Sequence, residues 1–137
     1  MNACTFCQIV KKMKEAYIVY EDDEVIAFLD KYPLFKGHTL VVPKEHYENI
    51  FEAPDEVLCK LIKIAKKIAK AQIKTLNADG VRILQNNGRA AKQIIFHVHF
   101  HVIPFYYGLE IKYPRLEINK DDAVEVVNLL REALENG

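Results

Sequence analysis

Residues 97–102 alternate strictly between histidine and an apolar side chain, and this pattern constrains the fold more than any other feature of the chain. Successive side chains of a β-strand point to opposite faces of its sheet. The alternation therefore predicts a strand, which we place over residues 94–103 and end at Pro104. Its apolar residues would face a core, and His97, His99 and His101 would share the opposite face.

Four other short runs rich in apolar and β-branched residues predict strands, and three runs with helical periodicity predict helices. The strands are expected over residues 16–20, 25–30, 39–42 and 81–85, and the first two form a hairpin. Helices are expected over residues 5–12, 54–77 and 121–134. An antiparallel sheet of about five strands with helices set apart from it makes an α+β domain. The terminal helix is expected to bury Val124, Val127, Leu130 and Leu134.

The length and charge of the chain narrow its class. A chain of 137 residues can bury one core, so we expect a single domain over residues 1–137. Lys and Arg number 19, as do Asp and Glu, so the overall charge favours neither nucleic acid nor membrane as a partner. The sequence shows no signal peptide and no apolar run near the ~20 residues of a membrane span, so we expect a cytoplasmic protein.

The spacing of the three histidines indicates what they can bind. A strand rises about 3.3 Å per residue, so His97 and His101 lie about 13 Å apart and cannot share one metal ion with His99. An adjacent pair could hold an ion, and a polar strand surface is the third interpretation. A row of this length best suits an extended ligand with one histidine at the reacting atom. Because a neutral imidazole is available at pH 7, its free nitrogen can attack phosphorus when the other nitrogen donates to an acceptor. We therefore predict phosphorus chemistry on a nucleotide.

The residues before the histidines fit an anionic ligand. Gly88 allows a sharp turn that brings backbone N–H groups close to an anion. The amide side chains of Asn86 and Gln93 can donate to phosphate oxygens. On its own, this stretch is a common turn.

Several motifs together resemble the histidine triad (HIT) family. Residues 97–103 match its signature of three histidines alternating with apolar residues, and residues 85–93 resemble its usual lead-in. Residues 28–30, Pro33 and residues 37–44 match further segments in the right order. The resemblance runs from about Cys4 to Pro104 and is closest to the Hint-like branch of nucleotide-binding hydrolases.

This resemblance implies a homodimer of HIT-like subunits whose sheets join, with a family-variable tail and helix over residues 105–137. It implies attack on the α-phosphorus of purine nucleotide (AMP or GMP) derivatives, either phosphoramidates or dinucleoside polyphosphates. His99 would be the nucleophile that forms a nucleotidyl-histidine, with His101 and Gln93 as the other catalytic residues. The nucleotide would be bound by Asp30 at the ribose, His38 beside it, Asn86, Gln93 and His101 at the phosphates, and Phe6, Ile9 and Phe28 around the base.

Two positions depart from the family pattern. Lys92 stands where glycine is usual, and Ile94 stands where many hydrolases of the family have serine or threonine. A hydroxyl that could pass a proton to the leaving group is therefore missing at residue 94. The alternative function is a purine-nucleotide-binding module without catalysis.

Cys4 and Cys7 have the spacing of a metal half-site. A redox pair with this spacing normally follows a strand, whereas this pair precedes the first expected strand. Some Hint-like proteins hold a structural zinc through such a pair, a histidine and the first triad histidine, which implies His46 and His97 as the remaining ligands. Four protein ligands would leave no open position, so such a zinc would be structural, and no catalytic metal is required. Unmetallated thiols are the alternative, and Cys59 is expected to be a partly buried helix residue.

Overall fold

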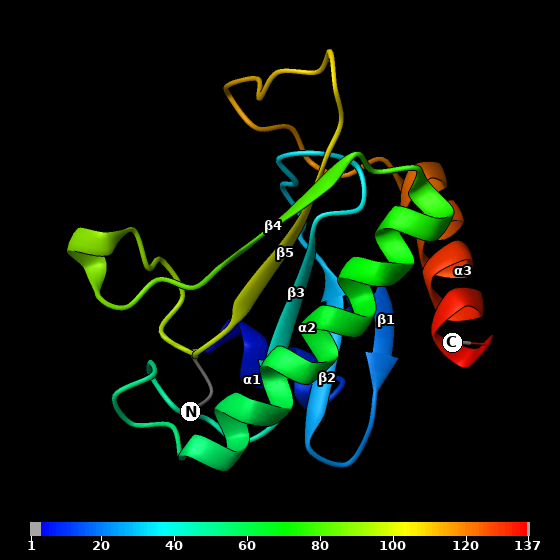
Figure 1. Cartoon of the computed structure of the whole chain (residues 1–137). Coiled ribbons are helices and arrows are strands. Elements are labelled where there is room, and N and C mark those ends of the chain that lie inside the picture. Colours follow the sequence, from blue (N-terminus) through cyan, green and yellow to red (C-terminus); the bar gives the residue numbers. More distant parts are fainter. Residues whose placement is uncertain (1–3, 137) are drawn as a thin grey trace.

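The computed structural model describes residues 4–136 and shows one five-stranded antiparallel sheet with helices on both faces (Figure 1), which confirms the α+β class. The strands are ordered β1-β2-β3-β5-β4 across the sheet. Their bounds are β1 (Ile18–Glu21), β2 (Val25–Leu29), β3 (Thr39–Pro43), β4 (Gly80–Leu84) and β5 (Phe100–Phe105). The helices are α1 (Thr5–Val10), α2 (Asp55–Leu76) and α3 (Lys120–Asn136), with a 3-10 turn η1 at Arg89–Ala91.

Helix α2 covers one face of the sheet because one side of it is continuously apolar. Leu61, Ile64 and Ile68 are buried against β2, β3 and β5 in the main core. Acidic Asp55 and Glu56 lie in its first turn, where they complement the helix dipole. The helix ends at Asn77, whose left-handed backbone forms the C-cap. Of the described helices, none is long and apolar enough to cross a membrane.

Helix α3 packs beside α2 and β1, through a face that overlaps the predicted one only in part. The residues it buries are Ala123, Val126, Leu130 and Ala133, whereas Val124 is exposed. Leu130 is buried as predicted, and Val127 and Leu134 are partly buried against the same core. The prediction missed the alanines because it counted only large apolar side chains. The alanines have no bulk beyond Cβ, so they let α3 lie close to its neighbours. Asn119 caps the helix by accepting from the backbone N–H of Asp121.

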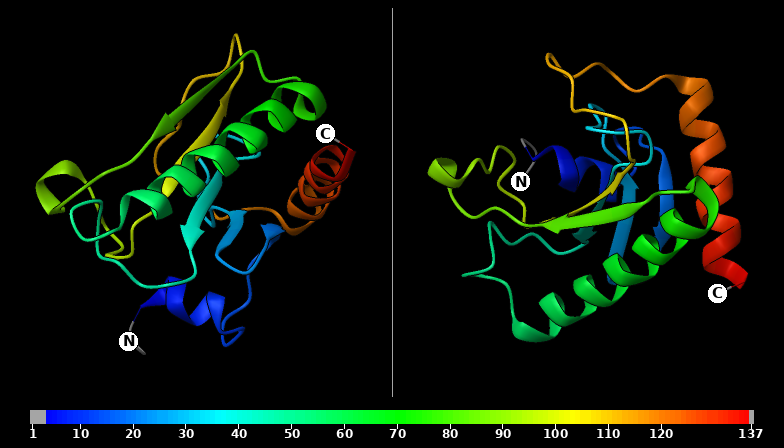
Figure 2. Two further views of the ribbon diagram at one scale, coloured as in Figure 1. Left: turned by 60° about the horizontal axis from the view of Figure 1, so that its bottom comes forward. Right: turned by 45° about the horizontal axis from the view of Figure 1, so that its top comes forward.

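The other face of the sheet carries α1 and the three histidines. Phe6 and Ile9 of α1 pack on Phe28, Leu40 and neighbouring residues in a second apolar layer. Figure 2 shows α1 on the side of the sheet away from α2. Because both faces are covered, every residue of β2 and β3 is buried, and these strands do not alternate between apolar and polar residues.

The strand predicted over residues 94–103 is shorter than expected and begins later. β5 starts at Phe100, and its pairing with β3 begins at the Val41–Phe100 position. Residues 94–99 pair with no neighbouring strand of the described chain, so His97 and His99 precede β5. Pro104 does not end the strand. It lies beyond the last residue that pairs with β3, where β5 is paired only with β4 and the missing proline N–H is tolerated.

Candidate functional site

His97, His99 and His101, called the histidine row below, follow each other along one side of the sheet. The ring centroids of His99 and His101 are 4.9 Å apart. The ring of Phe6 lies edge-on to the rings of both His97 and His99 and so bridges them. Val98 and Val102, the alternate residues, are fully buried. The row thus keeps the expected separation of histidine and apolar side chains although only His101 lies in a regular strand.

At the N-terminal end of the row, four potential metal ligands converge. Cys4 is the N-cap of α1, Cys7 lies in its first turns, His46 follows β3 and His97 precedes β5. Their ligand atoms all lie within 4.8 Å of one another. The Nδ1 atom of His97 is 3.5 Å from each sulfur and 3.1 Å from Nδ1 of His46, which is 3.3 Å from the sulfur of Cys7.

The tautomer of His97 suits a metal ligand. Its Nε2 lies 2.8 Å from the carbonyl oxygen of Pro43, which can only accept a hydrogen bond, so Nε2 carries the proton. The lone pair on Nδ1 therefore points at the two sulfurs. Burial raises the pKa of the Cys7 thiol, so this thiol stays protonated unless a positive ion binds beside it. The arrangement can hold one four-coordinate metal ion with no open position.

His99, in the middle of the row, is held as a neutral imidazole with a fixed tautomer. Its Nδ1 lies 2.7 Å from the carbonyl oxygen of His97, so Nδ1 carries the proton and Nε2 keeps its lone pair. Burial lowers the pKa of His99, which keeps this lone pair unprotonated at neutral pH. The second nitrogen is thus fixed by an acceptor, as nucleophilic attack by an imidazole requires.

At the C-terminal end of the row, His38 and His101 form a hydrogen-bonded relay. The backbone N–H of Leu34 donates to Nδ1 of His38 over 3.0 Å, so the proton of His38 is on Nε2. That Nε2 lies 3.0 Å from Nδ1 of His101, which accepts, and the proton of His101 is therefore on Nε2. Burial lowers the pKa of His38 to about 2 and that of His101 to about 4, so both rings are neutral.

Asp30 closes this end of the site. Its backbone N–H donates to the carbonyl oxygen of His38 over 2.9 Å, which brings the ends of the β2–β3 connection together. Its Oδ2 is 3.4 Å from Nε2 of His38, and its Oδ1 accepts from the backbone of Tyr32. The potential ligand atoms of Asp30, His38 and His101 all lie within 4.8 Å of one another. Because Nε2 of His38 carries a proton, the group fits a hydrogen-bond relay and not a metal site.

Phe6, Ile9 and Phe28 are buried together next to the histidine row. The rings of Phe6 and Phe28 meet edge-to-face with centroids 5.3 Å apart, and Phe6 is 5.0 Å from the ring of His99. The three residues predicted to surround a base therefore form one apolar cluster beside His99.

Gln93 is used within the protein. Its side-chain oxygen accepts from the backbone N–H of Gly88 over 2.8 Å, and its amide donates to the carbonyl oxygens of Glu48 and Ile95. Both hydrogens of the amide are thus occupied, and Gln93 holds the shape of the loop that follows β4. The side-chain amide of Asn86 makes no hydrogen bond to residues 4–136, so its donors remain available to a ligand.

The two positions that depart from the family pattern have distinct structural features. Lys92 has a φ of 74°, a left-handed backbone that glycine adopts without strain. Ile94 is 88% exposed, so it contributes to the surface and not to the core.

One charged neighbour of the site was missed from the sequence. The guanidinium of Arg115 lies 3.3 Å from Oδ2 of Asp30. These residues are 85 positions apart, and Arg115 belongs to an irregular segment whose path has no periodic signal. In the sequence, Arg115 is marked only by its position directly after Tyr113-Pro114, and this position does not indicate a contact with Asp30.

Comparisons with known proteins agree with this geometry. A family model described as HIT domain matches residues 11–107. An uncharacterized HIT-like protein of Methanocaldococcus jannaschii is 53% identical over 105 residues, which are 77% of this chain and 81% of that protein. The adenylylsulfatase HINT3 of Arabidopsis thaliana is 40% identical over 103 residues, which are 75% of this chain and 52% of that protein.

Two solved structures are similar over nearly the whole chain. A hypothetical histidine triad nucleotide-binding protein from Sulfolobus tokodaii strain 7 is 43% identical with a TM-score of 0.90, covering 97% of this chain and 93% of that one. A zinc-bound histidine triad family protein from Mycobacterium smegmatis is 36% identical with a TM-score of 0.89, covering 98% and 95%. The chain therefore belongs to the histidine triad (HIT) family, which has hydrolases among its members.

Proposed function

We propose that this protein is a nucleotidyl hydrolase or transferase that attacks the α-phosphorus of a purine nucleotide derivative. The substrate is a nucleoside phosphoramidate or a dinucleoside polyphosphate, and the intermediate is a nucleotidyl group on His99. The observation that carries the proposal is the 2.7 Å contact between Nδ1 of His99 and the carbonyl oxygen of His97. It leaves the Nε2 lone pair of a buried, neutral ring as the nucleophile.

The reaction divides into two displacements at the α-phosphorus. First, Nε2 of His99 forms a bond to phosphorus while the bond to the leaving amine or phosphate breaks, and the leaving group takes a proton from solvent because Ile94 offers no hydroxyl. Water then attacks the phosphorus and loses a proton, and the P–N bond breaks to return its electron pair to Nε2. Throughout, the Nε2–H of His101 donates to a non-bridging oxygen, whose negative charge it stabilises.

The rest of the nucleotide extends from this point in both directions. Asp30 accepts from the ribose hydroxyls, and His38 lies behind it and orients His101. Phe6, Ile9 and Phe28 contact the purine, whose flat apolar face suits an aromatic surface. Asn86 donates to the phosphates, and Gln93 holds the Gly88 turn against them.

The four-ligand cluster holds a structural zinc ion. Zn–S bonds of about 2.3 Å and Zn–N bonds of about 2.0–2.1 Å place tetrahedral S and N ligands about 3.5 Å apart and two N ligands about 3.3 Å apart. The observed separations of 3.1–3.5 Å fit these values, and the related Mycobacterium smegmatis protein is zinc-bound. Bound zinc ties α1 to the segment that presents His99. Reduced thiolate ligands suit the cytoplasm, where thiols stay reduced.

A homodimer forms through β4. This strand lies at one edge of the sheet and exposes Ile83 together with backbone groups that another strand can pair with. The opposite edge is partly covered, because Arg131 of α3 donates to the carbonyl oxygen of Ile18 in β1. Joining two β4 strands continues the sheet across both subunits.

Turnover and nucleotide binding of wild type and His99→Ala test the proposed function. We expect His99→Ala to lose turnover of an adenosine phosphoramidate by on the order of 10³-fold or more and to keep binding AMP. A variant that turned over at the wild-type rate would exclude His99 as the nucleophile. AMP binding by wild type without any product, over a panel of phosphoramidates and dinucleotides, would favour the alternative of a purine-nucleotide-binding module.

A further inference from the structure

The segment of residues 106–119, between β5 and α3, forms no helix or strand and is fixed at both ends. The Tyr106 hydroxyl donates to the carbonyl oxygen of Lys36 over 2.9 Å. The backbone N–H of Ile118 donates to the carbonyl oxygen of Lys31 over 2.7 Å. Between these anchors the side chain of Arg115 returns to Asp30, at the ribose end of the proposed site. The segment therefore places the guanidinium of Arg115 beside Asp30, the carboxylate proposed to bind the ribose.

The hydrogen-bonding groups of Arg115 are only partly used. One guanidinium nitrogen, Nη2, donates to Oδ2 of Asp30 over 3.3 Å. Its Nε is buried and has no hydrogen-bond partner within residues 4–136. Buried N–H groups are nearly always paired, and an arginine that served only as a counter-ion could pair with a carboxylate through two N–H groups. The contact with Asp30 alone does not account for the position of this side chain.

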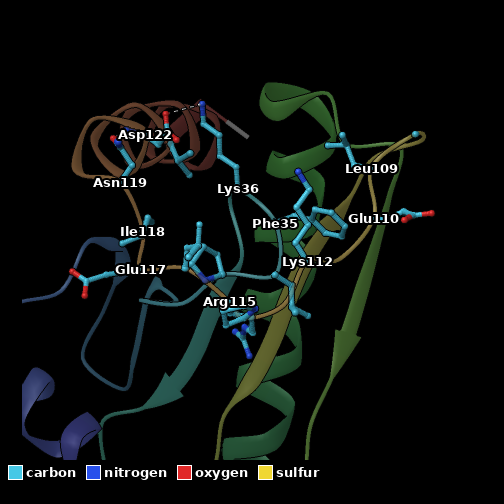
Figure 3. Close-up of a pocket in the computed structure, with 16 residues that line it drawn as sticks. Phe35, Lys36, Leu109, Glu110, Lys112, Arg115, Glu117, Ile118, Asn119 and Asp122 are labelled. Atoms are coloured by element: carbon cyan, nitrogen blue, oxygen red, sulfur yellow. Dashed lines mark hydrogen bonds and ion pairs between the residues drawn. The ribbon is translucent and has the colours of Figure 1, made fainter.

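Space for a ligand group adjoins the guanidinium. A cavity of about 950 Å³ lies between the loop of residues 33–36, the segment of residues 106–119 and the start of α3. Figure 3 shows Arg115 at the side of this cavity nearest the strands. Arg115 thus joins the cavity to the nucleotide site at Asp30.

The chemistry of a ribose matches this pair of residues. Each ribose hydroxyl can donate one hydrogen bond and accept others, whereas a carboxylate only accepts and a guanidinium only donates. Asp30 alone therefore satisfies the hydroxyl hydrogens and leaves the oxygen lone pairs unpaired. Oδ1 has one protein donor, the Tyr32 N–H, so lone pairs remain for hydroxyls while Arg115 stays in place.

We propose that Arg115 contacts the sugar together with Asp30, and that this Asp–Arg pair makes the site specific for ribonucleotides. The inference rests on the proposed nucleotide function and adds a specificity-determining residue to it. Removing both ribose hydroxyls deprives Asp30 of its donors and Arg115 of its acceptors. A site with buried polar groups discriminates strongly against a ligand that leaves them unpaired.

The test is a calorimetric titration of the full chain with AMP and with 2′,3′-dideoxy-AMP. Wild type is compared with Arg115→Ala, Arg115→Lys and the control Lys112→Ala, which changes a cation of the same segment and cavity. We expect wild type to bind AMP more tightly than dideoxy-AMP. Arg115→Ala should reduce this preference about tenfold, mostly by weakening AMP binding. Arg115→Lys should fall between, because lysine lacks the planar fork, and Lys112→Ala should match wild type.

Three outcomes would overturn the inference. An unchanged preference for AMP in Arg115→Ala, or an equal loss for both ligands, would show that Arg115 does not read the hydroxyls. An equal loss of the AMP preference in Lys112→Ala would mean that removal of any positive charge from this segment weakens binding, and that no specific contact of Arg115 is responsible. Failure of wild type to bind AMP would reject the proposed function itself and this inference with it. Thermal unfolding of each variant separates misfolding from lost contacts, and the charge-conserving Arg115→Lys retains the test should Arg115→Ala fold poorly.

Discussion

The two ends of the histidine row use their ring nitrogens in opposite ways. At His97, the free lone pair faces two thiols and a second histidine, a group that a bound metal ion would join. At His101, Nδ1 accepts from His38, which in turn accepts from a backbone N–H, so the two rings are held in place without an ion. In both places the partner of one nitrogen determines what the other can do. The comparison explains how neighbouring histidines in one sequence pattern can serve a metal, a bond-forming step and a phosphate.

The largest effect on this comparison is expected at the metal end. Replacing Cys7 in Cys7→Ser removes one of four ligands, so bound zinc should fall from one ion per chain to near zero. The unfolding midpoint should fall by about 10 °C or more, because metal binding contributes directly to folding. Elemental analysis and thermal unfolding measure the two effects. Cys59→Ser is the control: Cys59, expected from the sequence to be partly buried, is exposed on α2, so its replacement should alter neither value. Full zinc content in Cys7→Ser would reject the assigned ligand set.

The relay end is tested by His38→Ala, which should leave zinc content unchanged. Without the hydrogen bond from His38, the proton of the His101 ring can move to Nδ1. Nε2, which faces the phosphate, then has no proton to donate. We expect kcat to fall about 100-fold with a smaller change in KM. In His38→Gln the side-chain amide can still donate near the former Nε2, so part of the rate should return. Equal activity of His38→Ala and wild type would mean that the relay does not orient His101.

The pH dependence of stability distinguishes the relay from a solvated pair of histidines. The folded-state pKa of His101 is lowered to about 4 and that of His38 to about 2, from an ordinary value near 6.5. Between pH 6.5 and 4 the unfolded chain therefore takes up protons that the folded chain refuses. The free energy of unfolding should therefore decrease as the pH is lowered from 6.5 to 4, by up to about 1.4 kcal/mol per pH unit for each of the two histidines.

Urea unfolding at a series of pH values gives this slope. The titratable and charged groups that face His38 are His101, His99, Asp30 and Arg115. Asp30 and Arg115 are unchanged in His38→Gln. That variant should lose the contribution of one histidine to the slope. An identical slope in wild type and His38→Gln would contradict a neutral, buried His38.

The smallest expected effect concerns the backbone of the loop that precedes the histidine row. Lys92 holds a φ of 74° in the loop after β4, a conformation that costs a residue with a Cβ about 1–2 kcal/mol. Lys92→Gly should remove this cost and lose about 0.5–1 kcal/mol of it to the greater freedom of the unfolded chain. The free energy of unfolding should rise by up to about 1 kcal/mol. Lys92→Ala keeps the Cβ and should show no such gain, and a gain of equal size there would refute strain at this residue.

The sequence predicted most of the fold because apolar periodicity reports directly on burial. It located all five strands and the long helix, including the face of α2 that carries Leu61, Ile64 and Ile68. The prediction failed where hydrogen bonding to a neighbouring strand, and not the apolar pattern, decides whether a segment forms a strand. Residues 94–99 alternate like a strand, yet β4 ends opposite His101 and the pairing of β3 with β5 ends at Phe100. Ala123 and Ala133 on the buried face of α3 were missed because alanine carries little periodic signal.

The candidate site divides in the same way. The short Cys4–Cys7 spacing and the histidine alternation indicated residues that the structure brings together. The tautomers depend on contacts with Pro43, Leu34 and a backbone carbonyl, which no spacing reveals. Gln93 was expected to face a phosphate, and its amide instead bonds to Glu48, a contact across 45 residues. Arg115 reaches Asp30 through an irregular segment, so its role depended on the three-dimensional path of the chain.

The central claim is that His99 forms a covalent nucleotidyl intermediate, and mass measurement of the intact protein tests it most directly. Wild type and His99→Ala are incubated briefly with an adenosine phosphoramidate and quenched in alkaline denaturant, because acid cleaves a P–N bond to histidine. The account predicts a single added AMP on wild type, located at His99 by peptide fragmentation, which disappears as free AMP accumulates. His99→Ala should carry no adduct. An adduct on another residue, or AMP release by His99→Ala at the wild-type rate, would contradict the account.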